Sequence, residues 1–477
     1  MSAETSYDLV VLGGGAAAFA AITEAGERGL SAALVNTGLP LGGTCVNVGC
    51  VPSKHLLAVA HETFGPPNNP FNAIRYSEEQ PDFDWSTALD EKDELVETVR
   101  GSNYYDVADY YDADVYEGRR RFVDDTTIEV VEGKDQGTRI TGEKSLVATG
   151  SSPKIPDIKG LDEIDFLTSE SILTRENQPD SVLVVGAGYV GLEWGQILNH
   201  LGTDVTIFQR SERVLSKMEG MIGRTVQDIF EDEGVEVVTE AQVSRVGEDG
   251  EEEIYAETET NGETRMFTAS DLFMATGVKA NTKDIGLEEI GIETDEQGAV
   301  VIDESMQTSN SNVYGAGDCA NTLALETVAA KEGNFTVKNA FGNEHRTINY
   351  KAIPKVIYTR PEIASVGVTE LEYMDEHGTC SCRTVQLGEV PRALAVKDTR
   401  GFLQVVKHHG TDEIMGVHMV SRRAGDIIPE ATLAVKHGLT VDDIIDTVHP
   451  FPTFSEAFKH ACQAFRYNAD AMTCCVQ

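Results

Sequence analysis

Positive charge is scarce in this sequence. Its 477 residues include 38 Lys and Arg against 79 Asp and Glu, which gives a formal net charge of −41. The carboxylates are spread along the whole chain and are densest at residues 82–97, 248–253 and 442–446. Such a charge repels the phosphates of nucleic acid and of anionic membranes. We therefore exclude nucleic acid and membranes as partners.

Other features are missing as well. No apolar run approaches the roughly 18 residues that a membrane span needs. The first residues, from Met1 to Ser6, lack the basic stretch and apolar core of a signal peptide. Eight cysteines are too few for a disulfide scaffold in a chain of this length. We expect a cytoplasmic protein whose cysteines are thiols.

The excess of acid also bears on stability. Like charges repel one another in the folded state unless salt screens them, and the Debye length falls to about 3 Å at 1 M salt. We interpret the composition as that of a salt-loving protein from a halophile. A merely acidic protein that works at low salt is the alternative.

A glycine-rich unit opens the chain. The pattern predicts a buried strand at residues 7–12, a helix of small residues, and a second strand at residues 32–35. An acidic residue that holds a ribose usually ends such a unit, whereas here Asn36 stands in that place and can hydrogen-bond without charge. Three small residues between strand and helix let the backbone reach a pyrophosphate at the helix N-terminus: Gly13, Gly15 and Ala18.

A second unit of the same kind follows. Its strands are predicted at residues 181–185 and 205–209, and its glycines are Gly186, Gly188 and Gly191. One such motif is weak evidence, but two copies between strand and helix make chance a poor explanation. We expect the chain to bind two dinucleotides.

The end of the second unit indicates which nucleotide it binds. Gln209 replaces the usual acidic ribose ligand, and Arg210 and Arg213 follow. Loss of the carboxylate removes repulsion against a 2′-phosphate, and arginines supply forked donors to it. We favour NADPH over NADH; the alternative is that both arginines are solvated surface charges.

The remaining pattern divides the chain. Residues 146–150 end a strand and lead into Pro153 and Pro156, and residues 273–277 repeat the Ala-Thr-Gly phrase, which indicates crossovers out of and back into a first domain. From Lys351 the pattern becomes that of a separate unit. The predicted fold class is α/β, with two Rossmann-like dinucleotide-binding domains and a C-terminal α+β domain.

Two cysteine pairs stand far apart in the sequence. Cys45 and Cys50 follow the first nucleotide loop, where we expect a redox dithiol that faces a flavin. Cys474 and Cys475 are adjacent near the C-terminus. A disulfide between neighbours closes a strained ring, whereas two free thiols bind a soft metal ion well. Together the pairs suggest reduction of a thiol-bound metal.

Three segments carry a family resemblance. Residues 42–54, 308–318 and 358–367 resemble the flavin-dependent pyridine nucleotide–disulfide oxidoreductases. The resemblance implies an FAD-binding domain at 1–152 and 281–350, an NAD(P)-binding domain at 153–280 and a dimerisation domain at 351–477.

The family pattern also implies roles for single residues. Asp318 would hold the ribityl chain of FAD. Lys54 would lie near flavin N5 and pair with Glu193, although an ordinary salt bridge is the alternative. Further cofactor-binding positions implied in this way are Gly43, Thr44, Thr149, Gly150 and Gly277.

The C-terminal segment distinguishes members of the family. Dihydrolipoamide dehydrogenases and glutathione reductases have a catalytic His followed five residues later by Glu, an acid–base pair for disulfide chemistry. This chain has Phe451 in the His position, with Glu456 in place and His449 two residues earlier. Phe cannot move protons, so disulfide exchange is disfavoured. A dihydrolipoamide dehydrogenase-like or other disulfide reductase remains the alternative.

The tail points to one branch. Residues 391–395, 398–402 and 471–477 resemble the mercuric reductases, which carry paired tail cysteines. That branch has Tyr at the position of Phe451, and its second tyrosine matches Tyr104. Many of its members also have an N-terminal metal-binding domain, whereas this chain begins at the flavin strand.

The resemblance implies a mechanism. NADPH and FAD would reduce the Cys45–Cys50 pair, with Cys50 against the flavin. Cys474 and Cys475 of the partner subunit would take Hg²⁺ from small thiols and pass it inward, in a homodimer that shares its active site. A soft-metal-binding thiol protein without turnover is the alternative from another class.

The other cysteines are less informative. Cys319 and Cys462 are expected to be core residues. Cys380 and Cys382, with His377 just upstream, offer three metal ligands. A structural zinc site needs a fourth, and none is evident nearby, so we favour an exposed hairpin.

Overall fold

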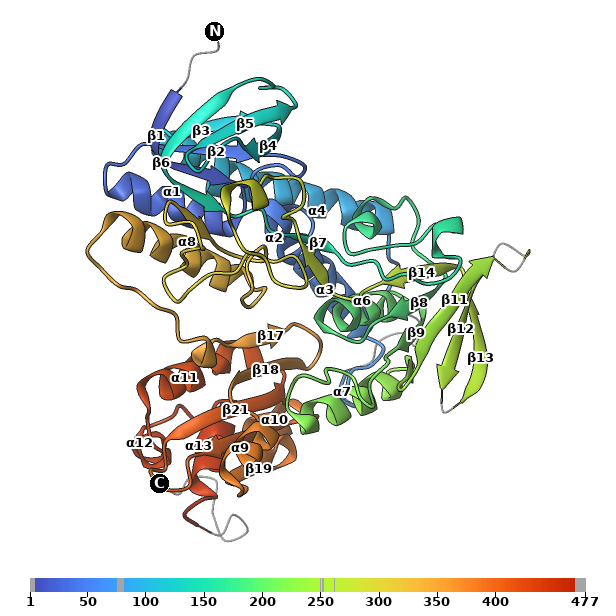
Figure 1. Cartoon of the computed structure of the whole chain (residues 1–477). Helices are drawn as coiled ribbons and strands as arrows, with labels where there is room; N and C mark the ends of the chain where they lie inside the picture. Colours follow the sequence, from blue (N-terminus) through green and yellow to red (C-terminus); the bar gives the residue numbers. More distant parts are fainter. Residues whose placement is uncertain (1–4, 75–80, 249, 251–252, 261, 468–477) are drawn as a thin grey trace.

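The structure is a computed structural model that describes residues 5–74, 81–248, 250, 253–260 and 262–467. Three bodies are visible in Figure 1: the first at the top, the second to the right in green, and the C-terminal one at the bottom in orange and red. The tail cysteines, Cys474 and Cys475, lie outside the described residues.

The first body is built on a seven-stranded sheet. Four consecutive apolar residues of its central strand, from Leu9 to Leu12, are fully buried, as expected where a parallel sheet is covered on both faces. The sheet order is β3-β2-β1-β6-β5-β4, with β16 beside β6. The strands are β1 (Thr5–Leu12), β2 (Ala32–Asn36), β3 (Asp114–Glu117), β4 (Arg119–Phe122), β5 (Thr127–Glu132), β6 (Arg139–Val147) and β16 (Val313–Gly315).

Helices α1 (Ala16–Glu27) and α8 (Glu326–Phe341) cover one face of this sheet and lie side by side (Figure 1). They cross closely, because a Cβ on Gly333 would lie 2.0 Å from the carbonyl oxygen of Ala17. Three further helices carry predicted active-site residues: α2 (Gly43–Asn47), α3 (Cys50–Phe64) and the π-helix η1 (Gly101–Tyr105). Helices α4 (Trp85–Arg100) and α5 (Asp106–Tyr110) directly precede and follow η1.

The second body has a parallel sheet in the order β10-β9-β8-β14. A three-stranded antiparallel sheet of β11, β12 and β13 flanks it. The elements are β8 (Ser181–Val185), α6 (Tyr189–His200), β9 (Asp204–Phe208), α7 (Gly220–Asp232), β10 (Glu236–Val238), β11 (Gln242–Glu248), β12 (Ile254–Thr260), β13 (Glu263–Ala269) and β14 (Asp271–Met274).

The two crossovers between these bodies lie together. Strand β7 (Ser151–Pro153) leaves the first body and pairs with β15 (Val278–Ala280), which returns to it. The predicted crossover phrases at residues 146–150 and 273–277 end immediately before these strands.

The C-terminal body has an antiparallel sheet in the order β17-β18-β21-β20-β19. It packs against residues of four helices around a core that includes Val405, Met419 and Phe458. Its strands are β17 (Lys355–Ile357), β18 (Glu362–Gly367), β19 (Cys382–Gln386), β20 (Phe402–Lys407) and β21 (Ile414–Ser421), and its helices are α9 (Glu370–His377), α10 (Pro391–Val396), α11 (Ala424–His437), α12 (Val441–Asp446) and α13 (Glu456–Gln463). The predicted fold class, two dinucleotide-binding α/β domains and a C-terminal α+β domain, is confirmed.

The nucleotide turns of the two bodies share a steric constraint. Gly13 has φ +136°, and a Cβ there would lie 2.1 Å from the carbonyl oxygen of Ala148. Gly186 has φ +111°, and its Cβ would lie 2.4 Å from that of Ala275. Only glycine fits either turn.

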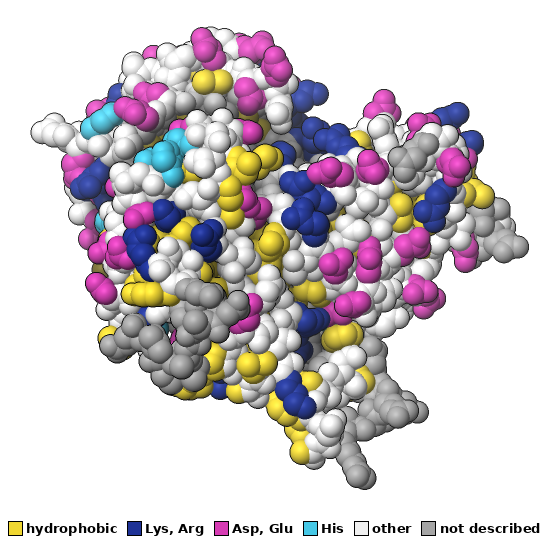
Figure 2. All heavy atoms as spheres, turned by 90° about the horizontal axis from the view of Figure 1, so that it is seen from below, with side chains coloured by type: hydrophobic (Ala, Val, Ile, Leu, Met, Phe, Trp, Pro, Cys, Tyr) yellow, Lys and Arg dark blue, Asp and Glu magenta, His cyan; other side chains and the backbone are white. Residues whose placement is uncertain are grey.

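Acidic side chains are scattered over the face shown in Figure 2 and do not gather into one patch. Within the described ranges, no helix combines the length and the apolar composition that crossing a membrane requires.

Candidate active site

The two thiols of the first pair meet where α2 ends and α3 begins. Cys45 lies on α2 and is half-buried, while Cys50 is the first residue of α3 and is exposed. The pKa of Cys50 is lowered, first by the hydrogen bond from Cys45 and also by the positive charge of Lys54, against the effect of burial. The pKa of Cys45 is raised by that same hydrogen bond and by burial. Cys50 is therefore the thiolate of the pair, and Cys45 holds the proton.

An ion pair lies one helical turn beyond Cys50. Lys54 Nζ donates to Glu193 Oε2 on α6, and it lies 5.2 Å from the centroid of the Tyr358 ring. The other oxygen, Glu193 Oε1, accepts from the backbone N–H of Tyr358 at 2.9 Å. Glu193 is only 7 % exposed. One carboxylate thus connects all three bodies beside the dithiol.

A second junction lies one turn further along α6. The Gln196 side chain accepts from the backbone N–H of Arg360 at 2.7 Å and donates to the carbonyl oxygen of Arg360 at 3.1 Å. The Arg360 guanidinium donates to the carbonyl oxygen of His61 on α3 at 3.1 Å. The same three bodies are therefore joined twice.

Tyr104 lies near the thiols on the π-helix η1, and such single π-turns are common at functional sites. Its ring packs edge-on against Phe19, with centroids 4.7 Å apart. Burial raises the pKa of Tyr104 to about 12, and the negative charges of Glu326 and of the Cys50 thiolate add to the effect. The phenol keeps its proton at neutral pH.

Glu326 was not predicted from the sequence. It is the first residue of α8, and its carboxylate acts on Cys45, Cys50 and Tyr104, in each case opposing loss of a proton. No sequence motif includes Glu326, because an irregular segment separates it from Asp318, eight residues earlier. Only the fold brings it to the dithiol.

The residues of the first body fit FAD. The half-buried Asp318 accepts from Ser151 Oγ at 2.7 Å through Oδ2, and its Oδ1 has no hydrogen bond among the described residues. Burial raises the pKa of Asp318. A buried carboxylate with a vacant acceptor suits a polyol hydroxyl. Gly15 and Gly43 also approach closely, since a Cβ on Gly43 would lie 2.8 Å from the Cα of Gly15, so the nucleotide cradle has no room for a side chain at Gly43.

Glu332 supports the Asp318 loop and was likewise missed. It is fully buried on α8, and its Oε2 accepts from the backbone N–H of Gly317 at 2.7 Å. Its Oε1 accepts from Tyr350 Oη at 2.7 Å. Burial raises the pKa of Glu332.

The other predicted residues of the first nucleotide site lie around the same cradle. Asn36 ends β2, and its Nδ2 donates to the carbonyl oxygen of Leu39 at 2.8 Å, which holds the following loop. Ala18 is fully buried on α1, Thr44 is on α2, and Thr149 and Gly150 follow β6 directly.

The second nucleotide turn leaves room for a ligand. A Cβ on Gly188 or on Gly277 would meet nothing within 4 Å, whereas a Cβ on Gly191 would lie 1.9 Å from the carbonyl oxygen of Gly186. Two of the glycines thus face open space and the third allows close packing of α6, which is the division of roles expected at a pyrophosphate site.

The predicted 2′-phosphate residues follow β9. Arg210 is exposed. Arg213 donates to Glu212 at 2.5 Å and to the carbonyl oxygen of Ser216 at 3.3 Å. Gln209 Nε2 donates to the carbonyl oxygen of Arg213 at 3.3 Å. Arg210 is thus the freer of the two guanidiniums.

The C-terminal loop keeps His449 and Glu456 apart. Phe451 is 53 % exposed. His449 turns inward, where its Nε2 lies 2.9 Å from Glu430 Oε1, and this contact raises the pKa of His449. Glu456 is buried at the start of α13 and accepts from the backbone N–H of Thr453 at 3.2 Å. Glu456 therefore supports the loop and does not pair with His449.

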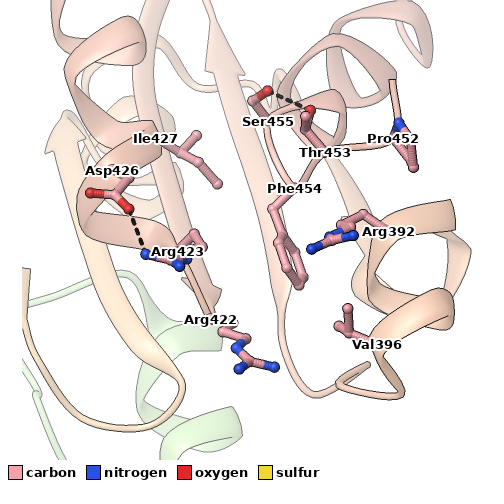
Figure 3. Close-up of a pocket in the computed structure, with 10 residues that line it drawn as sticks. All are labelled: Arg392, Val396, Arg422, Arg423, Asp426, Ile427, Pro452, Thr453, Phe454 and Ser455. Carbon is pink, nitrogen blue, oxygen red and sulfur yellow. Dashed lines mark hydrogen bonds and ion pairs between the residues drawn. The ribbon is translucent and has the colours of Figure 1, made fainter. Parts of the chain in front are cut away.

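A cavity of about 600 Å³ opens beside this loop (Figure 3). Its wall includes the cations Arg392, Arg422 and Arg423, and Arg423 pairs with Asp426 at 3.1 Å. All its lining residues belong to the C-terminal body, so the cavity is separate from the dithiol of the same subunit.

The remaining cysteines divide as follows. Cys319 and Cys462 are fully buried, as predicted. Cys380 and Cys382, for which an exposed hairpin was favoured, lie where the chain passes from helix α9 to strand β19, with Cys380 exposed and Cys382 half-buried. The two thiols gather with Glu370, whereas the ligand atoms of His377 gather with those of His408 and His409. Glu370 lies ten residues before Cys380, across helix α9, and no local pattern indicates it.

Comparison with known proteins agrees with this architecture. The family model described as pyridine nucleotide-disulphide oxidoreductase matches residues 7–333, and that of its dimerisation domain matches residues 353–462. The chain therefore belongs to the pyridine nucleotide–disulfide oxidoreductases, whose cofactors are FAD and a pyridine nucleotide.

Individual relatives of this chain within the family are mercuric reductases. The mercuric reductase of Streptomyces lividans is 39% identical over 100% of this chain and 99% of its own length. That of Staphylococcus aureus is 37% identical over 98% of this chain and 84% of its own. Among solved structures, the Cu(II) complex of the HOCl-induced flavoprotein disulfide reductase RclA from Escherichia coli has the same fold, with TM-score 0.86, 24% identity, and coverage of 96% of this chain and 99% of that one.

The electrostatics of the dithiol give a first prediction. Lys54 lowers the pKa of Cys50, and Glu193 opposes it. Lys54→Met should raise the pKa of Cys50, so the pH at which Cys50 is alkylated at half its maximal rate should move upward. Glu193→Gln should move it to lower pH. The measurement is the pH profile of iodoacetamide labelling of the Cys50 peptide in reduced protein. Shifts of the same sign in both variants would contradict the electrostatic assignment.

Proposed function

We propose that this protein catalyses NADPH-dependent reduction of Hg²⁺ to Hg⁰ through FAD and the Cys45–Cys50 dithiol. The observation that carries the proposal is a thiolate-forming dithiol in a chain that places Phe451 where an acid–base His would serve disulfide substrates. Full-length similarity to mercuric reductases supports it.

The chain's own residues would act as follows. Asp318 and the glycine turn at Gly13 would hold FAD, which when bound supplies the two-electron chemistry between NADPH and the dithiol. Cys50 binds Hg²⁺ first because it is the thiolate. Cys45 then gives up its proton as it becomes the second ligand. Two electrons supplied from NADPH through FAD would reduce the ion to Hg⁰, which leaves both sulfurs in the thiol or thiolate form.

Delivery of the ion would use the tail. Cys474 and Cys475 of the partner subunit would take Hg²⁺ from small thiols and transfer it to Cys45 and Cys50 by stepwise exchange. Tyr104 lies near Cys45 and Cys50 and keeps its proton at neutral pH. It would donate a hydrogen bond to a thiolate of this pair during the exchange. The dimerisation domain supports a homodimer that shares its active sites.

The test compares substrates. Purified protein should oxidise NADPH rapidly with Hg²⁺ in excess thiol, and slowly with lipoamide or glutathione disulfide. A preference for either disulfide would indicate a disulfide reductase, in which the His449–Glu430 pair moves protons. Tight Hg²⁺ binding without NADPH oxidation would indicate a metal-binding protein without turnover.

The arginines after β9 give the second prediction. Replacing Arg210 and Arg213 together by Ala should lower the ratio of kcat/KM for NADPH over NADH roughly tenfold to a hundredfold, because a charge-assisted hydrogen bond is worth about 1.5–3 kcal/mol. Arg210→Ala alone should account for the larger share, since Arg213 is already paired with Glu212. Lys217→Ala, which removes an exposed cation nearby, is the matched control and should leave the ratio unchanged.

Several finer assignments belong to the same proposal. The FAD domain comprises residues 1–152 and 281–350, the NADPH domain 153–280 and the dimerisation domain 351–477. The protein works in a salt-rich cytoplasm, where the reduced dithiol persists and salt screens the acidic surface.

A further inference from the structure

Two thiols and a carboxylate gather outside the active site, in the C-terminal body. The Cys380 thiol donates to Glu370 Oε1 at 2.8 Å. The sulfurs of Cys380 and Cys382 lie 3.3 Å apart. The three donor atoms all lie within 4.8 Å of one another. The group therefore has the size of a metal coordination sphere.

The fold fixes Glu370 and Cys382 from two different elements, and Cys380 lies in the segment between those elements. Glu370 begins α9, which a capping box of Thr369 and Glu372 holds, and its backbone N–H donates to Glu219 at 2.9 Å. Cys382 begins β19 and stands opposite Val406 of β20. Ser381, between the two cysteines, accepts from the backbone N–H of Lys407 at 2.9 Å. The cluster is held by secondary structure on both sides.

A buried side chain orients the carboxylate. Gln404 is 1 % exposed, and its Nε2 donates to Glu370 Oε2 at 3.2 Å. The other oxygen, Oε1, stays turned toward the thiols. Outer residues that orient a ligating carboxylate in this way are a regular part of metal sites.

We propose that Glu370, Cys380 and Cys382 form a second binding site, separate from the redox dithiol, for a soft divalent cation of the Cd²⁺ and Hg²⁺ class. Binding would form two metal–sulfur bonds and release two thiol protons to solvent. With the zinc–sulfur distance of about 2.3 Å, two sulfurs on a tetrahedral ion lie about 3.8 Å apart. A larger soft ion holds its sulfurs further apart, so the pair would have to open by at least about half an ångström from its present 3.3 Å.

The number of protein ligands predicts how the site behaves. Three ligands leave one position of a tetrahedral ion open, whereas structural zinc sites close all four. Cys380 is exposed and Cys382 is half-buried, so solvent reaches the cluster. The ion should therefore exchange readily with thiols in solution.

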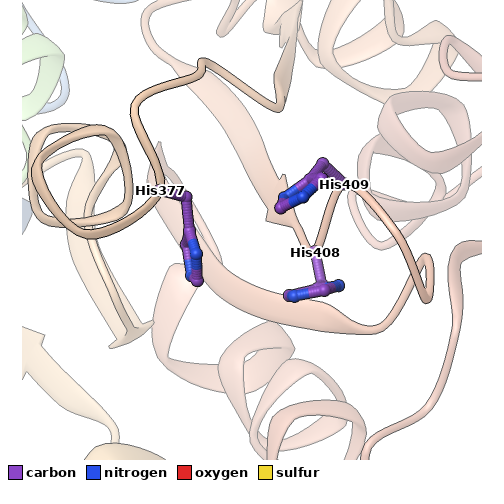
Figure 4. A group of neighbouring side chains, drawn as sticks. All are labelled: His377, His408 and His409. Carbon is purple, nitrogen blue, oxygen red and sulfur yellow. The ribbon is translucent and has the colours of Figure 1, made fainter.

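The neighbouring histidines fit a metal less well. His377, His408 and His409 converge in Figure 4. However, His408 Nδ1 accepts from the backbone N–H groups of Gly410 and Thr411 at 3.2 and 3.0 Å. Neutral imidazole then carries its proton on Nε2, so neither ring nitrogen offers a lone pair to an ion.

The test uses full-length protein in which Cys45, Cys50, Cys474 and Cys475 are all replaced by Ser. In reduced form it should bind one equivalent of Cd²⁺ in equilibrium dialysis, with a thiolate-to-metal charge-transfer band in the ultraviolet. Adding Cys380→Ser and Cys382→Ser should abolish both signals. Glu370→Gln should weaken binding roughly tenfold while keeping the band.

Two controls separate the alternatives. His377→Ala with His408→Ala should leave Cd²⁺ binding intact, and the buried Cys319 and Cys462 remain in every variant. Cd²⁺ binding that survives loss of Cys380 and Cys382, or that disappears with the histidines, would overturn the proposal. In otherwise native protein, Cys380→Ser with Cys382→Ser should not change mercury turnover, so this site and the proposed function are tested independently.

Discussion

Replacing Cys474 and Cys475 by Ala should lower mercury turnover in excess thiol by about a hundredfold, equivalent to about 2.7 kcal/mol of activation free energy. The dithiol alone would then have to extract Hg²⁺ from competing thiols, and Cys45 holds its proton too firmly to compete well. Reduction of a small quinone by NADPH should be unchanged, because it needs no metal transfer. Steady-state NADPH oxidation with each acceptor measures both effects.

The same variant tests transfer between subunits. Heterodimers that combine it with a Cys45→Ala, Cys50→Ala subunit should recover part of the mercury activity if the tail acts across the dimer. The matched control is Cys380→Ala with Cys382→Ala, which also removes two thiols from the C-terminal body. Unchanged mercury turnover after loss of the tail thiols would remove the basis for the delivery step.

Salt should have the second large effect, on stability. With a net charge of −41, self-repulsion opposes the folded state until counterions screen it. Raising KCl from dilute buffer to molar concentration should increase the melting temperature by on the order of 10 °C, which corresponds to several kcal/mol in a protein of this size. Thermal unfolding followed by circular dichroism measures the change.

A pH control isolates the charge effect. At about pH 4.5, where Asp and Glu are partly protonated, the same salt step should raise the melting temperature much less. KCl and NaCl should act alike, because screening depends on ionic strength. A melting temperature that does not respond to chloride salts at neutral pH would contradict the halophilic interpretation.

Residues in local motifs could be predicted from the sequence, since neighbours along the chain determine their setting. The glycine turns at Gly13 and Gly186 directly follow buried strands, and the apolar run before each glycine predicts both the strand and the turn. The contact between Lys54 and Glu193 was also expected, although 139 residues separate them, because family resemblance supplied the long-range information.

Residues that act through tertiary packing could not be predicted. Glu326 and Glu332 reach the dithiol and the Asp318 loop because α8 crosses α1, and no spacing in the sequence encodes that crossing. Glu370 meets Cys380 only because the chain turns after α9, whose C-cap Gly378 has a left-handed backbone. Glu456 was predicted from a family position, and the structure adds that its carboxylate accepts a hydrogen bond from the backbone N–H of Thr453.

The junction at Glu193 and Gln196 has a consequence for motion. A hinge between the nucleotide-binding bodies would require the ion pair to Lys54 and the hydrogen bonds to Tyr358 and Arg360 to break together. Leucines of α3 and α6 and Ile357 also share one hydrophobic cluster there. Opening would leave buried polar groups without hydrogen-bond partners, which costs on the order of 1–3 kcal/mol of free energy for each group. The total cost is therefore several kcal/mol. The three bodies therefore keep one arrangement before and after NADPH binds. The slow steps of turnover should be the binding and release of ligands, and not a rotation of the second body.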